Sequence, residues 1–173
     1  MPNPPVIVLM GVSGSGKTTL GLLLAKRTGA IFADADDYHS AANKAKMATG
    51  NPLTDEDRRP WLETLNGILE SWLTARQSGI LACSALKEKY RETLTASLPK
   101  AAVQFVFLDG SKQMIAERLA KRHHEYMTSK LLESQLDTLE RPKEALWVVN
   151  DRSPGIVVDE ILRKLKMRSV NGT

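Results

Sequence analysis

The chain has 173 residues, of which 42% are hydrophobic and 25% are charged, with a formal net charge of +4 at pH 7. These values are typical of one globular domain, and they exclude a collagen-like, low-complexity or intrinsically disordered chain. The mild positive charge requires no nucleic-acid partner, and the absence of a long apolar stretch predicts neither a signal peptide nor a membrane span. Cys83 is the only cysteine, which excludes an intrachain disulfide and favours a reducing, cytoplasmic compartment. We expect Cys83 to be a buried apolar residue of a strand.

A strand, a glycine-rich loop and a helix are predicted in succession near the start of the sequence. Residues 6–10 are all apolar, as in a strand buried on both faces. Residues 11–18 read Gly-Val-Ser-Gly-Ser-Gly-Lys-Thr, a complete G-x-x-x-x-G-K-[ST] phosphate-loop pattern. Residues 19–27 have a helical pattern, and Gly29 is a good helix stop. This order puts a bound phosphate at a helix N-terminus, so the pattern indicates a functional site and not a chance glycine-rich turn.

Each part of this loop has a role in holding a nucleoside triphosphate. Its glycines let the backbone turn tightly and aim successive N–H groups at one anion. Lys17 supplies a positive charge for the β- and γ-phosphates, and the Thr18 hydroxyl is placed to bind Mg²⁺. The residues predicted to bind ATP are Gly11, Val12, Ser13, Gly14, Ser15, Gly16, Lys17 and Thr18.

Further strands alternate with helices along the rest of the chain. Short apolar runs predict strands at residues 30–33, 80–83, 103–108 and 146–149. A helix between two of these strands has a shared apolar face and is expected to begin near Pro60: Trp61, Leu65, Ile68, Leu69 and Trp72. Ser111 and Ser153 are predicted to cap two later helices. The sequence therefore predicts one doubly wound α/β domain over residues 1–173, with a five-stranded parallel sheet and ligands beyond the carboxyl ends of its strands.

Two carboxylates follow the second predicted strand, in the segment Asp34-Ala35-Asp36-Asp37-Tyr38-His39. If strand geometry persists, Asp34 and Asp36 point to the same side. One can then hold the Mg²⁺ shell while the other orients or deprotonates an acceptor hydroxyl, the two tasks that phosphoryl transfer needs. The alternative is an acidic turn with a capping aspartate. Ser84 stands where an aspartate often follows the third strand, which increases the weight on Asp34 and Asp36.

Basic residues follow the third and fourth strands. Lys87 lies near the expected cleft and is a candidate for an anionic substrate group, although it is also consistent with a solvated lysine. Arg118 and Arg122 are four residues apart, so they share a helix face and suit two arginines that close over a transferring phosphate. A surface pair with no such role is the alternative. His123 and His124 have no third ligand at metal spacing, so we predict no zinc site there.

Several segments together resemble the gluconate kinase (gluconokinase) family of P-loop kinases. In one-letter code they are residues 10–17 (MGVSGSGK), 34–39 (DADDYH), 43–62 (NxxKMxxGxPLxDxDRxPWL), 83–91 (CSALKxxYR) and 131–140 (LLxSQxxTLE). They cover most of the chain in the same order. The first segment is generic among nucleotide-binding proteins, whereas residues 43–62 are much more specific. The resemblance implies ATP-dependent phosphorylation of D-gluconate to 6-phosphogluconate, a fold like that of shikimate and nucleoside monophosphate kinases, and a cytoplasmic homodimer.

The resemblance and the motifs lead to a first assignment of roles. Asp34 and Thr18 are assigned to Mg²⁺, and Asp36 to the attacking hydroxyl. The catalytic set is Lys17, Asp36, Arg118 and Arg122. Candidates for binding gluconate are Asp36, His39, Arg58, Lys87, Arg91 and Gln135, with the cations expected at its carboxylate and His39 and Gln135 at its hydroxyls.

The lid, at about residues 122–130, departs from the family pattern. It reads His124-Glu125-Tyr126-Met127 where Gly-His-Phe-Met is expected, and Leu136 stands where the family tends to have Phe. Another small-metabolite kinase on the same scaffold, acting on shikimate or a nucleotide, is the nearest alternative function. A GTP-binding switch is a distant one, because Asn150-Asp151-Arg152-Ser153 does not match the guanine-reading Asn-Lys-x-Asp.

Overall fold

The computed structural model describes residues 5–121 and 129–168, and it contains the predicted parallel sheet. Five strands run in the order β2-β3-β1-β4-β5, and every neighbouring pair is parallel. The strands are β1 (Val6–Met10), β2 (Ile31–Asp34), β3 (Gly79–Ala82), β4 (Val103–Asp109) and β5 (Leu146–Val149). The helices are α1 (Lys17–Thr28), α2 (Ala41–Ala48), α3 (Asp55–Thr74), α4 (Glu88–Leu94), α5 (Lys112–Lys121), α6 (Ser129–Thr138), α7 (Pro154–Lys164) and a 3₁₀ turn, η1 (Ala35–Tyr38).

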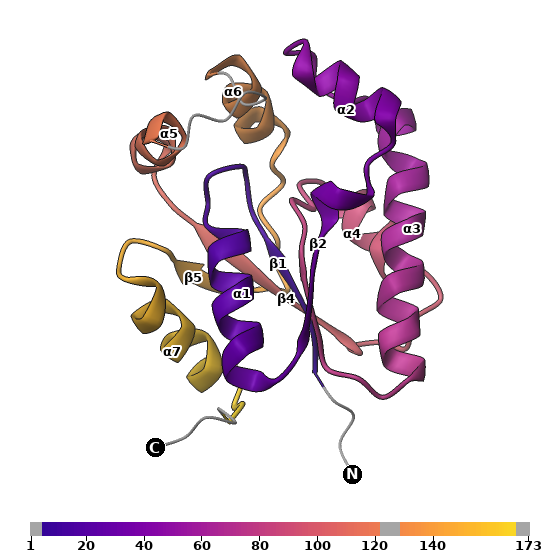
Figure 1. Cartoon of the computed structure of the whole chain (residues 1–173), viewed down its shortest axis with the longest axis vertical. Coiled ribbons are helices and arrows are strands. Elements are labelled where there is room, and N and C mark those ends of the chain that lie inside the picture. Colours follow the sequence, from indigo (N-terminus) through magenta and orange to yellow (C-terminus); the bar gives the residue numbers. More distant parts are fainter. Residues whose placement is uncertain (1–4, 122–128, 169–173) are drawn as a thin grey trace.

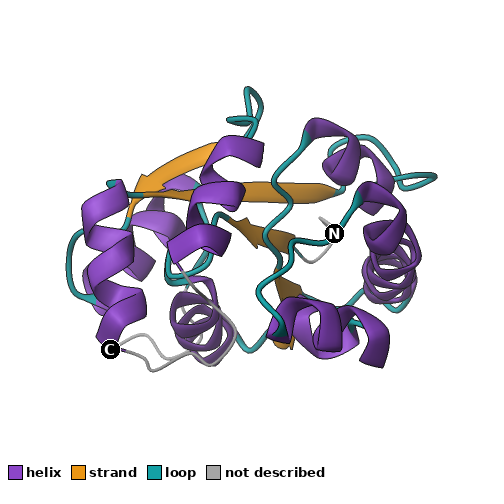
Figure 2. Ribbon diagram, turned by 90° about the horizontal axis from the view of Figure 1, so that it is seen from above, coloured by secondary structure: helices purple, strands orange, loops and turns teal. Residues whose placement is uncertain are grey.

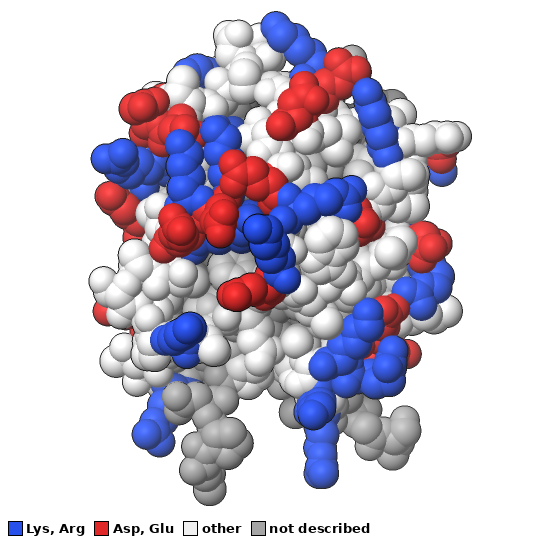
Figure 3. Space-filling view, turned by 180° about the vertical axis from the view of Figure 1, so that it is seen from behind, with Lys and Arg blue, Asp and Glu red and all other residues white. Residues whose placement is uncertain are grey.

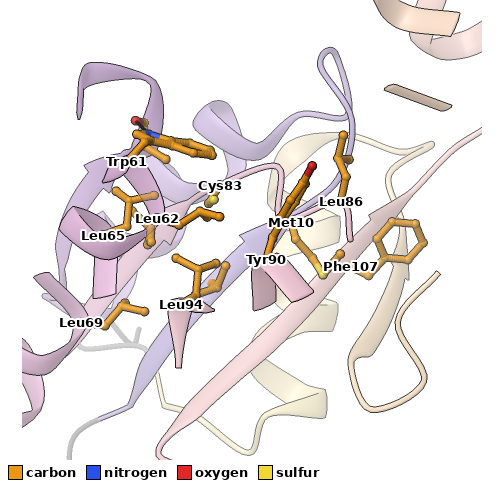
Figure 4. Close-up of a cluster of buried hydrophobic side chains, with 14 of the residues drawn as sticks. Met10, Trp61, Leu62, Leu65, Leu69, Cys83, Leu86, Tyr90, Leu94 and Phe107 are labelled. Carbon is orange, nitrogen blue, oxygen red and sulfur yellow. Dashed lines mark hydrogen bonds between the residues drawn. The ribbon is translucent and has the colours of Figure 1, made fainter. Parts of the chain in front are cut away.

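Helices cover both faces of the sheet (Figures 1 and 2). Alternate residues of a strand point to opposite faces, and β1 therefore contributes to two separate cores. Val6, Val8 and Met10 pack with α3 and α4 on one face, whereas Ile7 and Leu9 pack with α1 and α7 on the other. Figure 4 shows Met10 among side chains of the first of these cores. All five residues are fully buried, which explains why β1 is a continuous apolar run.

Helix boundaries largely follow the sequence signals. Gly29 ends α1 in the left-handed conformation, with φ 72°. Ser111 accepts the Met114 N–H at 3.2 Å, and Ser153 lies at the N-cap position of α7 without a capping side-chain hydrogen bond.

The expected start of the long third helix is wrong. The helix begins at Asp55, where Thr54 and Asp57 form a reciprocal capping box, and Pro60 lies inside it. Five helical residues, 55–59, precede Pro60, and the capping box at Thr54 determines where the helix starts. The sequence reading also lacked α2, whose N-cap is Ser40.

Cys83 lies one residue beyond β3 and is buried, and burial raises the pKa of its thiol to about 12. The thiol is therefore a small apolar core group at neutral pH.

Within the described residues, no helix is both long enough and apolar enough to cross a membrane. On the face opposite that of Figure 1, acidic and basic side chains are intermixed over the upper half of the surface (Figure 3).

Candidate active site

The phosphate loop connects β1 to the N-terminus of α1 at the carboxyl edge of the sheet (Figure 1). Gly14 and Gly16 have φ values of 79° and 100°, a region that glycine adopts without steric cost. Gly16 is the N-cap of α1, so the free N–H groups of the first turn point out of the helix at the loop. The Lys17 ammonium donates to the Gly11 carbonyl at 2.9 Å and to the Val12 carbonyl at 3.0 Å. Its charge therefore lies directly over the loop.

Thr18 and Asp34 meet across the gap between α1 and the end of β2. The Thr18 hydroxyl donates to Asp34 Oδ2 at 2.7 Å, while Asp34 Oδ1 accepts the Asp36 N–H at 3.0 Å. A hydroxyl and a carboxylate are the oxygen donors that Mg²⁺ prefers, and Mg²⁺ usually takes only one or two carboxylates and completes its shell with phosphate and water. The described residues contain no group of three or more His, Cys, Asp or Glu that could hold a metal. This pair therefore fits Mg²⁺ brought in with a triphosphate.

Asp34 and Asp36 do not lie on one continuous strand, so the expectation that strand geometry points them to the same side is wrong. Strand geometry ends at Asp34, because the next four residues form the 3₁₀ turn η1 with Asp34 as its N-cap. Asp34 is therefore the capping aspartate that the alternative interpretation predicted. One of its carboxylate oxygens caps the turn and the other accepts the Thr18 hydroxyl. Asp36 lies on the turn itself, and its side chain is 86% exposed. Asp34 therefore reaches the first turn of α1, and Asp36 presents an exposed carboxylate on the turn that follows.

His39 is buried behind Asp36. Its ring stacks on Trp61 with centroids 4.1 Å apart, and its Nε2 lies 4.0 Å from Asp36 Oδ1. Trp61 is fixed in turn by donation from its indole N–H to the Ala35 carbonyl at 2.7 Å. Burial, with the nearby charges of Arg58 and Lys44, lowers the pKa of His39 from 6.5 to about 4. His39 is therefore neutral at physiological pH and supports the turn that carries Asp36.

The lowered pKa predicts a specific acid sensitivity. Between pH 4 and 6.5 the unfolded chain protonates His39 and the folded chain does not, so the free energy of unfolding falls as pH decreases through this window. The contribution of one residue has a maximum slope of about 1.4 kcal/mol per pH unit. His39→Phe keeps a ring against Trp61 but cannot titrate, so we expect urea unfolding at pH 7.5, 6 and 5 to show a shallower decline for this variant. Parallel declines for variant and wild type would contradict the assignment.

The candidate cations on α3 and α4 surround Tyr90 and Asp55. Lys87 Nζ lies 3.3 Å from Asp55 Oδ1, and the Tyr90 hydroxyl and Lys89 also donate to this carboxylate. Lys89, Tyr90 and Lys87 hold the pKa of Asp55 well below its usual range. Arg58 lies over the Tyr90 ring, 5.3 Å from its centroid, and donates to the Tyr90 hydroxyl at 3.3 Å. Lys87 and Arg58 are thus brought together through one tyrosine.

Arg91 has a different environment from Lys87 and Arg58. Its guanidinium donates to the Ala85 carbonyl at 2.9 Å and to the Leu86 carbonyl at 3.2 Å. These bonds brace the segment between β3 and α4, where Ala85 has a positive φ of 45°. In this structure Arg91 therefore supports the loop that carries Lys87.

Arg118 lies on the side of the loop away from α3. Its guanidinium donates to the Asn150 carbonyl, and its Nη1 atom is buried without a hydrogen-bond partner. Asn150 directly follows β5, is only 6% exposed, and donates through Nδ2 to the Ser15 carbonyl at 2.8 Å. A Cβ on Gly16 would lie 2.2 Å from that Nδ2 atom, so the glycine also makes room for this contact. Arg122 and most of the predicted lid lie outside the described residues.

Gln135, on α6, is brought to the phosphate loop. Its Oε1 atom accepts the Ser13 N–H at 2.7 Å, across 122 residues of sequence. From the sequence we expect Gln135 to contact substrate hydroxyls. In the structure its side chain instead binds the Ser13 N–H of the phosphate loop.

Asn150, Tyr90 and Asp55 contact candidate site residues, and the sequence alone assigned no role to them. A signal existed for Asn150, because it is the first residue after the apolar run 146–149 and therefore lies at the carboxyl end of a strand. Asp55 and Tyr90 occur in the segments 43–62 and 83–91 that resemble gluconate kinases, but no motif in the sequence assigned a chemical role to either residue.

Comparison with known proteins identifies relatives over nearly the whole chain. Residues 6–143 match the family model described as AAA domain. A gluconokinase of Gluconobacter oxydans is 43% identical, and the alignment covers 93% of this chain and 91% of that protein. The crystal structure of a gluconokinase from Sinorhizobium meliloti is 40% identical and has a TM-score of 0.84, with 96% of this chain and 94% of that chain covered. Shikimate kinase from Aquifex aeolicus, 22% identical with a TM-score of 0.60 over 93% of this chain and 96% of that one, shares the fold.

Proposed function

This chain belongs to the gluconokinase family of ATP-dependent kinases, and we propose that it phosphorylates D-gluconate to 6-phospho-D-gluconate with Asp36 orienting the accepting hydroxyl. The observation that carries this proposal is the contact between Thr18 and Asp34. It joins the first turn after the phosphate loop to the end of β2, and the turn that follows carries Asp36. A site for the phosphoryl donor and a carboxylate for the acceptor therefore lie next to each other.

In the proposed reaction, the loop N–H groups and Lys17 hold the triphosphate at the N-terminus of α1. Thr18 and Asp34 would hold Mg²⁺, which would neutralise charge on the phosphates. Asp36 accepts a hydrogen bond from the attacking hydroxyl and takes its proton as the hydroxyl oxygen bonds to the γ-phosphorus of ATP. The bond between that phosphorus and the bridging oxygen breaks in the same step, and ADP leaves. The exposed carboxylate of Asp36 is reachable by an acceptor, and the neutral His39 ring lies beside it, with Nε2 at 4.0 Å from Asp36 Oδ1.

The remaining residues divide between acceptor and donor. Lys87 and Arg58 are proposed for the gluconate carboxylate, because both lie at Tyr90 and their charges are only partly balanced by Asp55. Arg118, and Arg122 beyond the described residues, are proposed for the transferring phosphoryl group. The buried Nη1 of Arg118 without a protein partner supports an anionic contact there.

The location and assembly of the protein are also proposals. A cytoplasmic enzyme is supported by the single free cysteine and by the use of ATP. A homodimer rests on the family resemblance, and equilibrium sedimentation would test it.

A panel of acceptors tests the function directly. We expect gluconate to give the highest kcat/KM when ADP release is measured with gluconate, shikimate and nucleoside monophosphates, each with MgATP. Faster turnover of shikimate or a monophosphate than of gluconate would assign the protein to a different kinase class on the same fold. Omitting Mg²⁺ in the presence of a chelator should abolish turnover of every acceptor.

A further inference from the structure

Helix α6 and the residues directly after it contact both halves of the candidate active site. At the donor half, Gln135 Oε1 accepts the Ser13 N–H of the phosphate loop at 2.7 Å. At the acceptor half, Glu140, just after α6, donates its N–H to the Leu86 carbonyl at 2.8 Å, and its carboxylate accepts the Glu88 N–H at 2.8 Å. The residue between these two contacts is Lys87, which we assign to the gluconate carboxylate.

The helix is anchored well enough to transmit a displacement from one contact to the other. Leu131 and Leu132 are 5% and 3% exposed, and Leu132 is part of the core shared with α3 and α4. A helix fixed by buried side chains moves as a unit, because its backbone hydrogen bonds keep its length constant. Gln135 lies in the last turn of α6, and Glu140 follows two residues after the helix ends.

We propose that Gln135 is a positioning residue that couples occupation of the phosphate loop to the position of Lys87. This inference rests on the proposed function. Phosphate loops bind anions through their backbone N–H groups, and the Ser13 N–H belongs to this loop. A phosphate oxygen at Ser13 competes with Gln135 Oε1 for that N–H, so the glutamine side chain must adjust when a nucleotide binds. Glu140, two residues after α6, holds the Leu86–Glu88 segment, so a shift of the end of α6 also moves Lys87. Nucleotide binding and acceptor binding are then energetically coupled.

Coupling of this kind is reciprocal and can be measured without turnover. The non-hydrolysable ATP analogue AMPPNP is titrated calorimetrically, with Mg²⁺, in the presence and absence of saturating gluconate. We expect gluconate to change the Kd of the wild-type protein for AMPPNP by about fivefold or more, and Gln135→Ala to reduce this ratio to about one. A ratio near one in the wild type, or an unchanged ratio in Gln135→Ala, would overturn the proposal. A purely structural loss of stability would not remove the ratio, because both titrations use the folded variant.

Two variants make the test specific. Gln135→Glu keeps an acceptor for the Ser13 N–H but adds a negative charge at the loop, so we expect it to bind AMPPNP more weakly than the wild type. Equal affinity would show that Gln135 does not face the phosphates and would also overturn the proposal. The matched control is Gln113→Ala, on α5, where an exposed glutamine donates to Glu117 at 3.1 Å. Its ratio should equal that of the wild type.

Failure of the proposed function is recognised separately. Wild-type turnover with gluconate is measured first, and a protein that phosphorylates another acceptor contradicts the function alone. The AMPPNP titrations are then repeated with the acceptor that the protein phosphorylates. The ratio of the Kd values with and without this acceptor, compared between the wild type and Gln135→Ala, decides the role of Gln135.

Discussion

Asp36→Asn is expected to lower kcat by about 10²–10⁴-fold, the range by which a positioned general base accelerates a reaction. The amide keeps the size of the side chain but cannot take a proton, and it is a weaker acceptor for the attacking hydroxyl. Asp36 belongs to the turn after β2 and not to the phosphate loop, so we expect the Kd for ATP to remain near the wild-type value. The measurement is ADP release at saturating gluconate, together with calorimetric titration of AMPPNP.

The control for this variant is Asp37→Asn. Asp37 is exposed on the same 3₁₀ turn, so this substitution makes the same change of charge one residue away. We expect Asp37→Asn to retain most of the wild-type kcat. Wild-type turnover by Asp36→Asn would remove Asp36 from the mechanism, and equal loss in both variants would indicate a general effect of charge on the turn.

Lys17→Ala should impair nucleotide binding and phosphoryl transfer together. Lys17 Nζ lies within 3.0 Å of the Gly11 and Val12 carbonyls, so its charge is fixed at the loop and needs little rearrangement to meet a phosphate. Removing one preorganised donor to developing charge typically costs about 10²–10³-fold in kcat. Because the same ammonium also binds the ground-state phosphates, we additionally expect a higher KM for ATP.

A lysine at the other end of the same helix provides the comparison. Lys26 is exposed in the last turn of α1, and Lys26→Ala removes the same charge far from the loop. Its kcat and its KM for ATP should stay close to the wild-type values. A fully active Lys17→Ala would show that the glycine-rich loop is not the phosphate site. Lys17→Arg gives a further check, because the wider guanidinium fork does not replace a compact ammonium and should not restore full activity.

Short sequence patterns correctly predicted those strands and helix ends that depend only on residues close together in the chain. The apolar run of β1 is buried on both faces, and Gly29 ends α1 in the left-handed conformation, as the sequence indicated. The start of α3 was misplaced, because a proline is a visible signal whereas the capping box at Thr54 is the stronger one. The turn after Asp34 was missed for a similar reason, since an aspartate that caps its own turn looks the same in sequence as one that ends a strand.

The sequence by itself predicted the donor half of the candidate site, because the phosphate loop is a contiguous segment whose backbone geometry depends on its own glycines. It also determined the class of fold, since apolar strands alternate with helices along the chain. Only the tertiary structure decided which side chains meet this loop. Gln135 and Asn150 reach it across 122 and 135 residues, through contacts that exist because the strand order 2-3-1-4-5 sets β1 at the centre of the sheet. Contacts of this kind depend on how elements pack against one another, and no local pattern in the sequence records that packing.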